Sequence, residues 1–148
     1  MLWGCFSYHG VGRLYMTRGK VDAPYYCKIL KFCAKPSLQA IYGDTECFFQ
    51  HDNAPVHTAA SSRKAIDDLG MNAIWWPGQS PDLNPIEHLW AQMKRKLHGR
   101  RFKNAQELFE GAKNEWCKVE KQNLEKLVES MPRRIQACIK ARGGATKY

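Results

Sequence analysis

The apolar pattern of this 148-residue chain changes near residue 80, and that change limits the folds available to it. Before residue 80, short apolar runs alternate with turn residues, which predicts strands at 2–7, 13–17, 46–50 and 72–76. After residue 80, apolar residues recur at helical spacing over 84–97, 104–116, 124–129 and 131–141. Strands followed by helices, with hairpin and crossover connections between them, predict an α/β layered domain.

Two further helices are predicted in the first half. Apolar residues recur at helical spacing over 22–34, and Pro36 is expected to end that helix. Residues 55–69 form the other, with Gly70 as its C-terminal stop. The length suits one domain with a sizeable core. We therefore expect a single domain over 1–148, with a strand-rich part at 1–80 and a helical part at 81–148.

The charge of the chain is strongly positive. Twenty-three Lys and Arg oppose fourteen Asp and Glu, a net charge of +9, which favours nucleic acid over an anionic membrane as a partner. No run approaches the roughly 18 apolar residues that span a bilayer, and the N-terminus shows neither a basic leader nor a cleavage signal. The six cysteines include no Cys-x-x-Cys pair, which predicts buried free thiols in a reducing compartment, either nuclear or cytosolic.

Two carboxylates stand where metal-dependent chemistry could use them. Asp52 follows the strand at 46–50, and Glu87 lies in the first turn of the helix at 84–97, with 34 residues between them. Phosphoryl transfer on DNA can use two divalent metals about 3.5–4 Å apart to stabilise the attacking and leaving oxygens. Mg²⁺ prefers oxygen ligands, and strand ends and helix starts hold carboxylates rigidly. Asp52 and Glu87 are therefore predicted to be catalytic metal ligands.

Each acid also has a structural explanation. Glu87 stands three residues after Asn84, as a capping box requires, and taken alone this explanation is favoured. Asp52 could form an Asx-turn, and Asp82 is expected to turn the chain into the helix without binding metal. A rival zinc site is less favoured because zinc ligands normally form tighter pairs in sequence, and His57 is expected to hydrogen-bond near Asp52. The zinc candidates are His51, Asp52, His57 and His88.

A basic run follows Glu87, and no acid interrupts it before Glu107. We expect its side chains to bind DNA phosphates, although a solvated helix face is the alternative. The members of this basic run are Lys94, Arg95, Lys96, Arg100, Arg101 and Lys103. Four tryptophans could stack on bases, but they fall on apolar stripes and are expected to pack in the core. These are Trp75, Trp76, Trp90 and Trp116.

Several blocks of the chain resemble mariner-superfamily DDE transposases. The two most specific are DNAPVH at 52–57 and SPDLNPIEHLW at 80–90, at that family's Asp-34-Glu spacing. LWGCFS at 2–7, MPRRI at 131–135 and GGATKY at 143–148 are also similar, so the resemblance covers nearly the whole chain. It implies a ribonuclease H-like fold, cut-and-paste DNA transposition and DNA integration with Mg²⁺ or Mn²⁺, a nuclear location and a possible homodimer.

The chain departs from the family pattern in two respects. The first Asp of the triad and its central strand are expected before residue 1, as is the helix-turn-helix region that binds transposon ends. The strands at 2–7 and 46–50 would flank that central strand, and without it both would expose backbone edges. We therefore expect the C-terminal part of a catalytic domain, inactive alone. The alternative is a non-catalytic nucleic-acid-binding or interaction remnant of a transposon.

Overall fold

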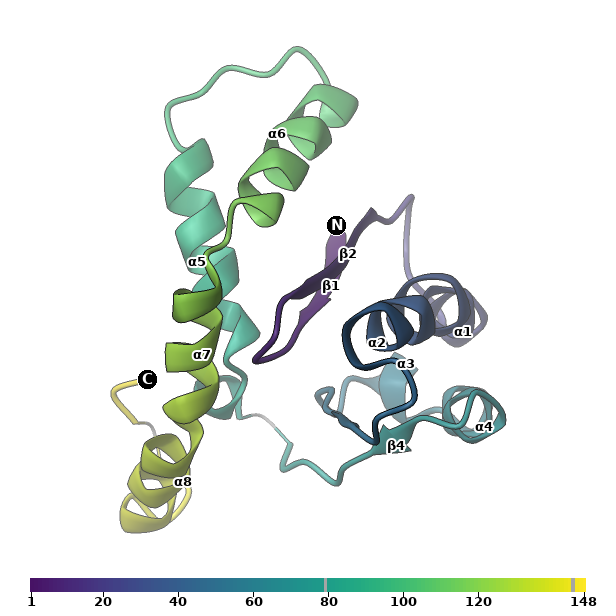
Figure 1. Ribbon diagram of the computed structural model, residues 1–148, viewed down its shortest axis with the longest axis vertical. Helices are drawn as coiled ribbons and strands as arrows, with labels where there is room; N and C mark the ends of the chain where they lie inside the picture. Colours follow the sequence, from purple (N-terminus) through teal and green to yellow (C-terminus); the bar gives the residue numbers. More distant parts are fainter. Residues whose placement is uncertain (79, 145) are drawn as a thin grey trace. The chain divides into compact units, whose positions relative to one another are not determined.

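The computed structural model describes residues 1–78, 80–144 and 146–148, and the chain forms two compact units (Figure 1). Unit 1 comprises Met1–Cys5 and Gly12–Gln79. Unit 2 comprises Phe6–Val11 and Ser80–Tyr148. All the strands in the described part of the chain lie before residue 80, but more residues there are helical than extended, and the described elements after residue 80 are all helices. Each unit is described separately below.

Unit 1 begins with the predicted hairpin and continues into a long helical segment. Strand β1 (Leu2–Phe6) pairs with β2 (Val11–Met16). The helical segment consists of α1 (Ala23–Ile29), the π-helical η1 (Leu30–Ala34) and α2 (Lys35–Tyr42). The Asp22 side chain caps it by accepting a hydrogen bond from the backbone N–H of Tyr25, which satisfies one of the unpaired donors at a helix start.

The expectation that Pro36 ends this helix was wrong. Proline has no N–H to donate to the carbonyl four residues earlier, here that of Phe32. The Arg13 guanidinium fills the gap, because its Nη1 donates to the Phe32 carbonyl oxygen at 2.8 Å. A π-helical turn also changes the backbone register just before the proline. The helix therefore continues through Pro36, with a side chain from β2 as the replacement donor.

The second sheet of unit 1 is a short parallel pair. Strands β3 (Phe48–Phe49) and β4 (Asn72–Ala73) pair with Phe48 opposite Asn72, and both are shorter than predicted. The crossover between them consists of α3 (Pro55–Thr58) and α4 (Ala60–Asp68). The predicted single helix at 55–69 is interrupted at Ala59, whose ψ of 145° is extended. Gly70 ends α4 with a positive φ of 59°, as predicted.

The core of unit 1 lies between the long helical segment, α4 and β3. Its buried side chains are Tyr26, Ile29, Leu30, Cys33, Ala34, Phe49, Ile66 and Met71. Two of them, Tyr26 and Phe49, lie against the His51 ring.

Unit 2 is helical apart from the tip of the β1–β2 hairpin. Its elements are η2 (Pro81–Leu83), α5 (Ile86–Leu97), α6 (Ala105–Cys117), α7 (Lys121–Glu129) and α8 (Met131–Lys140). Helix α6 has the predicted N-cap, since the Asn104 side chain accepts from the Glu107 N–H at 2.9 Å. Trp90 of α5 stacks on the buried Trp116 of α6, with ring centroids 5.2 Å apart.

Two sequence-based expectations about environment can be compared with the structure. All six cysteines are free, as expected, but only Cys33 is buried, and Cys117 is exposed. The expectation of uniformly buried thiols was therefore wrong. In the part of the chain that the structure describes, no helix has both the length and the apolar character to cross a membrane.

Candidate metal and nucleic-acid site

Asp52 lies on the loop that follows β3. Because β3 and β4 are parallel, the loops that follow them leave the sheet at the carboxyl ends of both strands, where ligands commonly bind in α/β folds. A hydrogen bond joins the two loops, since Asn53 Nδ2 donates to the Trp76 carbonyl oxygen at 2.6 Å. The side chain of Asp52 is 56% exposed, so its carboxylate can be reached from solvent.

Both hydrogen bonds to the Asp52 carboxylate fall on the same oxygen. The backbone N–H of Ala54 donates to Oδ1 at 3.0 Å, which is the Asx-turn expected for this acid. His57 Nδ1 lies 2.6 Å from the same Oδ1 and donates to it when the carboxylate is ionised. No hydrogen bond among the described residues engages Oδ2. The structural role of Asp52 therefore leaves one oxygen open for a metal ion.

An aromatic stack anchors His57 to the core. The His57 ring lies 4.2 Å from that of Tyr26 and 5.1 Å from that of His51. Tyr26 is 1% exposed, and its hydroxyl is 3.1 Å from His51 Nδ1. The imidazole that holds Asp52 thus rests on a buried phenol. The sequence indicated that His57 would hydrogen-bond near Asp52, but the part played by Tyr26 had no sequence signal that we recognised.

The rival zinc site gains no support from these positions. Among residues 1–78, 80–144 and 146–148, no group of three or more His, Cys, Asp or Glu side chains is arranged to hold a metal ion. His51 Nδ1 is directed to the Tyr26 hydroxyl and His57 Nδ1 to Asp52. His88 lies in unit 2, with its Nδ1 3.3 Å from a nitrogen of the Arg134 guanidinium.

Burial, together with the charge of His57, lowers the pKa of His51 to about 4. Because this folded-state pKa lies below the unfolded value near 6.5, folding favours the neutral ring. The stability that the neutral His51 ring contributes is complete above pH 6.5 and is lost as the pH falls towards 4. We predict that wild type loses more stability than His51→Gln between pH 7 and pH 4.5, measured by urea unfolding. His98→Gln, at an exposed position, should lose as much as wild type; equal losses in all three proteins would contradict this.

The predicted capping box around Glu87 is not formed. Helix α5 begins at Ile86 after Pro85 and has no side-chain cap. In a capping box, the Glu87 carboxylate would accept a hydrogen bond from the Asn84 N–H. That N–H donates instead to the Pro81 carbonyl oxygen at 3.0 Å and closes the η2 turn. Glu87 is exposed in the first turn of α5, and among the described residues its carboxylate forms no ion pair. The structural explanation of Glu87 therefore fails, and its carboxylate is available for a ligand.

A buried arginine fixes the turn that leads to Glu87. Arg134 of α8 is 2% exposed. Its Nη1 donates to the Asp82 carbonyl oxygen and its Nε to Ser130 Oγ, each at 2.8 Å. The guanidinium carbon lies 5.0 Å from the centroid of the Tyr148 ring. Arg134 had not been selected from the sequence; the only signal was a charged residue inside the MPRRI block.

The Asp82 side chain belongs to the same arrangement. Its Oδ2 accepts hydrogen bonds from Cys138 Sγ at 3.1 Å and Thr146 Oγ1 at 2.9 Å. These hydrogen bonds hold the pKa of the Asp82 carboxyl below its usual value, and the bond from Cys138 has the largest effect. We call this set of residues the Arg134 clamp: Asp82, Arg134, Cys138, Thr146 and Tyr148. It connects the η2 turn, which ends two residues short of the helix that carries Glu87, to the C-terminal segment of the chain.

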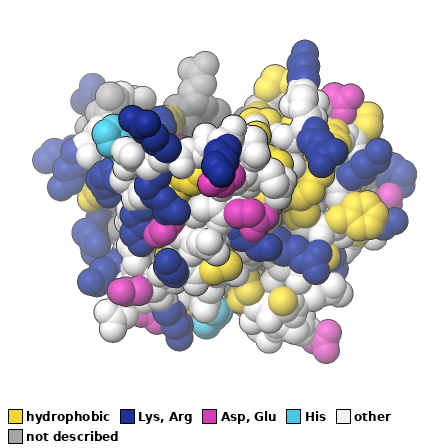
Figure 2. Space-filling model, turned by 90° about the horizontal axis from the view of Figure 1, so that it is seen from above, with side chains coloured by type: hydrophobic (Ala, Val, Ile, Leu, Met, Phe, Trp, Pro, Cys, Tyr) yellow, Lys and Arg dark blue, Asp and Glu magenta, His cyan; other side chains and the backbone are white. Residues whose placement is uncertain are grey.

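One acid on another helix pairs with two members of the basic run. Glu115 of α6 lies 3.3 Å from Arg100 and 3.8 Å from Lys96. The remaining members are exposed and form no ion pair with a described acid: Lys94, Arg95, Arg101 and Lys103. Lys and Arg side chains also outnumber acidic ones on the face drawn in Figure 2. These four cations are therefore the better placed to meet phosphates.

The tryptophans do not all behave as predicted. Trp116 and its partner Trp90 pack in the core of unit 2, as expected. Trp75 is 85% exposed, so the expectation of core packing was wrong there. It follows β4, a two-residue strand with both residues exposed, which offers no apolar face to cover a large ring.

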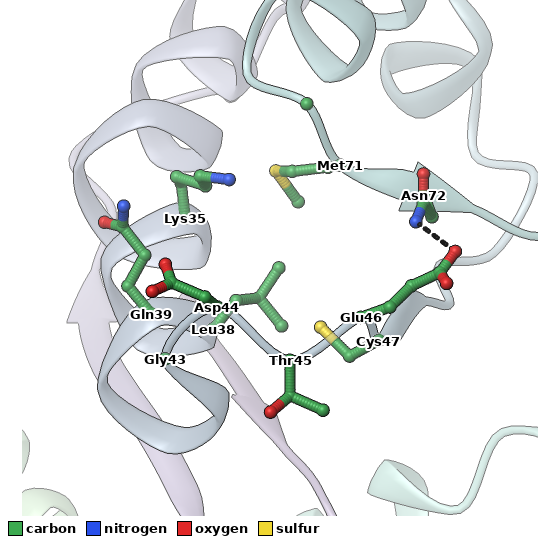
Figure 3. Close-up of a pocket in the computed structure, with 11 residues that line it drawn as sticks. Lys35, Leu38, Gln39, Gly43, Asp44, Thr45, Glu46, Cys47, Met71 and Asn72 are labelled. Atoms are coloured by element: carbon green, nitrogen blue, oxygen red, sulfur yellow. Dashed lines mark hydrogen bonds between the residues drawn. The ribbon is translucent and has the colours of Figure 1, made fainter.

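A cavity of about 270 Å³ lies at the other edge of the β3–β4 pair (Figure 3). It is lined by Asp44 and Glu46, which precede β3, and by Asn72, the first residue of β4. Asn72 Nδ2 donates to Glu46 Oε1 at 3.1 Å. Lys35 of α2 reaches into it, so charges of both signs line the walls. Because Asp52 lies beyond the carboxyl ends of the strands, this cavity is not part of the candidate site.

Comparisons with known proteins agree with these features. A family model described as DDE superfamily endonuclease matches residues 1–109. The transposable element Tc1 transposase of Caenorhabditis elegans is 40% identical over 149 residues, covering 100% of this chain and 54% of the relative. The mariner Mos1 transposase of Drosophila mauritiana is 31% identical over 100 residues, covering 64% of this chain and 28% of the relative. The chain spans about half the length of its Tc1-type relatives.

Solved structures show the same fold. The Mos1 transposase catalytic domain with raltegravir and Mg matches with a TM-score of 0.89 at 23% identity, covering 99% of this chain and 76% of that one. A Mos1 mariner paired-end complex with Mn matches with a TM-score of 0.90 at 24% identity, covering 99% of this chain and 44% of that one. The predicted α/β fold of a mariner-type catalytic domain is therefore confirmed at the level of the fold.

Proposed function

The chain belongs to the DDE superfamily endonuclease family, and from this we propose that it forms part of the catalytic domain of a cut-and-paste DNA transposase. In this proposal Asp52 and Glu87 are the metal ligands and DNA is the substrate. The observation that carries it is the Asp52 carboxylate, which is anchored through Oδ1 and open at Oδ2. Similarity across the whole chain, both acid blocks included, disfavours a non-catalytic remnant.

The donor set suits a hard divalent ion. Carboxylate oxygens are the ligands that Mg²⁺ and Mn²⁺ prefer, and solved relatives contain one or the other. Such ions, when bound, stabilise charge on the attacking and leaving oxygens of a phosphodiester. The protein contributes rigidity: His57 and the Ala54 N–H orient Asp52, and the Arg134 clamp fixes the turn before Glu87. Lys94, Arg95, Arg101 and Lys103 would hold the DNA backbone.

We further propose that the two small sheets belong to one ribonuclease H-like sheet. In the described part of the chain, β1–β2 and β3–β4 are separate two-stranded sheets, and each presents a strand edge with unpaired backbone groups. A further strand between β1 and β3 would satisfy both edges and could carry the third acid. Asp52 and Glu87 alone supply few ligands for two metal ions, so we expect no DNA cleavage by this chain alone. Glu87-dependent strand cleavage of a transposon-end duplex in Mn²⁺ would contradict that.

Paramagnetic broadening tests whether the two acids share an ion. Mn²⁺ added to ¹⁵N-labelled protein should broaden the amide signals of residues 50–54 and 86–88 together, since carboxyl groups sharing a metal pair lie within about 8 Å. Asp52→Asn should remove the broadening at both segments. Asp44→Asn, which alters an exposed acid outside the candidate site, should leave it unchanged. Broadening at only one segment, or broadening that survives Asp52→Asn, would overturn the proposed metal site.

Two consequences for the setting follow from the proposal. A transposase acts on chromosomal DNA, so we propose a nuclear location. Paired-end complexes are known for Mos1, and we propose by analogy that this chain acts as a homodimer on two DNA ends. Sedimentation of the protein with and without DNA would test the second point.

A further inference from the structure

A second basic surface lies in unit 1, far in sequence from the basic run. Residues 1–43 contain six Lys and Arg but a single acid, Asp22. The Asp22 side chain already caps α1 by accepting from the Tyr25 N–H. The remaining side chains of α1, η1 and α2 include no carboxylate at all. The positive charge of this helical segment is therefore not balanced by acids on the segment itself.

Two of the cations, Lys28 and Lys31, lie on the outer side of the segment, whereas Lys35 reaches into the cavity beside β3 and β4. Lys28 and Lys31 are exposed and Lys35 is half-buried, whereas Ile29, Leu30 and Ala34 between them are buried in the core. Among the described residues, none of the three lysines forms an ion pair, in contrast to Lys96 and Arg100 of the basic run. Lysines without a carboxylate partner give up little when they bind a phosphate.

A large aromatic side chain stands among these lysines. Phe32 is 58% exposed, and Lys31 Nζ lies 5.6 Å from the centroid of its ring. Its backbone is held in place, because the Arg13 guanidinium donates to the Phe32 carbonyl oxygen. The ring is therefore presented on a fixed, π-helical turn (η1), a local structure that is often found at functional positions.

We propose that this surface, defined by Arg13, Lys28, Lys31 and Phe32, binds single-stranded nucleic acid. Lysines that track a backbone, combined with an aromatic ring on which a base can stack, are what sequence-indifferent single-strand sites share. Charge complementarity selects a polyanion, and the exposed ring selects an unpaired base, since a duplex offers no free base face. This proposal does not depend on Asp52, Glu87 or the basic run.

The test compares affinities for two labelled DNAs by fluorescence anisotropy over a range of salt concentrations. The probes are a 20-nucleotide oligothymidine and a 20-base-pair duplex. Phe32→Ala should weaken oligothymidine binding about fivefold or more, the loss of one stacked base, without changing the salt slope. Lys28→Ala with Lys31→Ala should reduce the log–log slope by about 1.4, since each single-strand phosphate contact contributes about 0.7. Duplex binding should change less in the Phe32 variant.

Matched controls separate this surface from general effects. Phe48→Ala removes a 70% exposed ring from β3, and Lys121→Ala with Lys126→Ala removes two charges from α7. Neither should reproduce the losses. Phe32→Trp should retain binding. Wild-type affinity in Phe32→Ala, or an equal loss on duplex and oligothymidine, would overturn the proposal, as would a change in the oligomeric state of the free protein. Oligothymidine binding that needs Lys94 and Arg95 but not Phe32 would overturn this inference and leave the proposed function standing.

Discussion

Replacing Arg134 with Ala should destabilise unit 2 by about 3 kcal/mol or more, because it removes a large buried side chain and leaves buried acceptors unpaired. The acceptors are the Asp82 carbonyl oxygen and Ser130 Oγ, and the lost guanidinium also lay over the Tyr148 ring. Urea unfolding followed by near-UV circular dichroism of the stacked Trp90 and Trp116 would measure the change in unit 2.

Arg133 offers a matched control on the same helix. It is exposed, so Arg133→Ala should change the free energy of unfolding by less than about 0.5 kcal/mol. Amide hydrogen exchange adds a local test, since the backbone N–H groups of residues 83, 84 and 86–88 should exchange faster in Arg134→Ala under native conditions. Equal stability of the two arginine variants would mean that the Arg134 clamp contributes nothing to the turn before Glu87.

Removing Lys94 and Arg95 should have the larger effect on duplex DNA binding. Each lost phosphate contact lowers the log–log salt slope by about 0.9, so the double Ala variant should lose about 1.8 and bind roughly tenfold or more weakly at physiological salt. Both side chains are exposed and, among the described residues, form no ion pair. Titration of a labelled 20-base-pair duplex at several salt concentrations measures both quantities.

Lys96 and Arg100 provide the charge-matched comparison. Both lie near Glu115, at 3.8 Å and 3.3 Å, so their charge is already partly neutralised. Lys96→Ala with Arg100→Ala also removes two positive charges but should change the slope by less than half as much. If both double variants behave alike, the ion pairs with Glu115 do not decide which cations meet DNA. If neither changes binding, the basic run has no part in it.

Local chemistry determined the kinds of elements and many of their ends. The β1–β2 hairpin, the Asn104 cap of α6 and the Gly70 stop of α4 were all predicted, because each depends on residues within a few positions of one another. The two acid blocks were also recognisable from the sequence, since each is a contiguous run of residues and the spacing between them can be counted along the chain. The role of Asp52 as a metal ligand stays a prediction, and only the structure shows which of its oxygens is open.

Contacts between distant residues decided the rest. Pro36 failed to end its helix because Arg13, 19 positions before Phe32, supplies the missing donor. Asp52 is held by a histidine that rests on Tyr26 of another helix. Glu87 lost its expected cap to the η2 turn, which Arg134 fixes from 52 positions away. Periodicity and propensity report on neighbours along the chain, whereas burial and hydrogen-bond partners depend on which segments the folded core brings together.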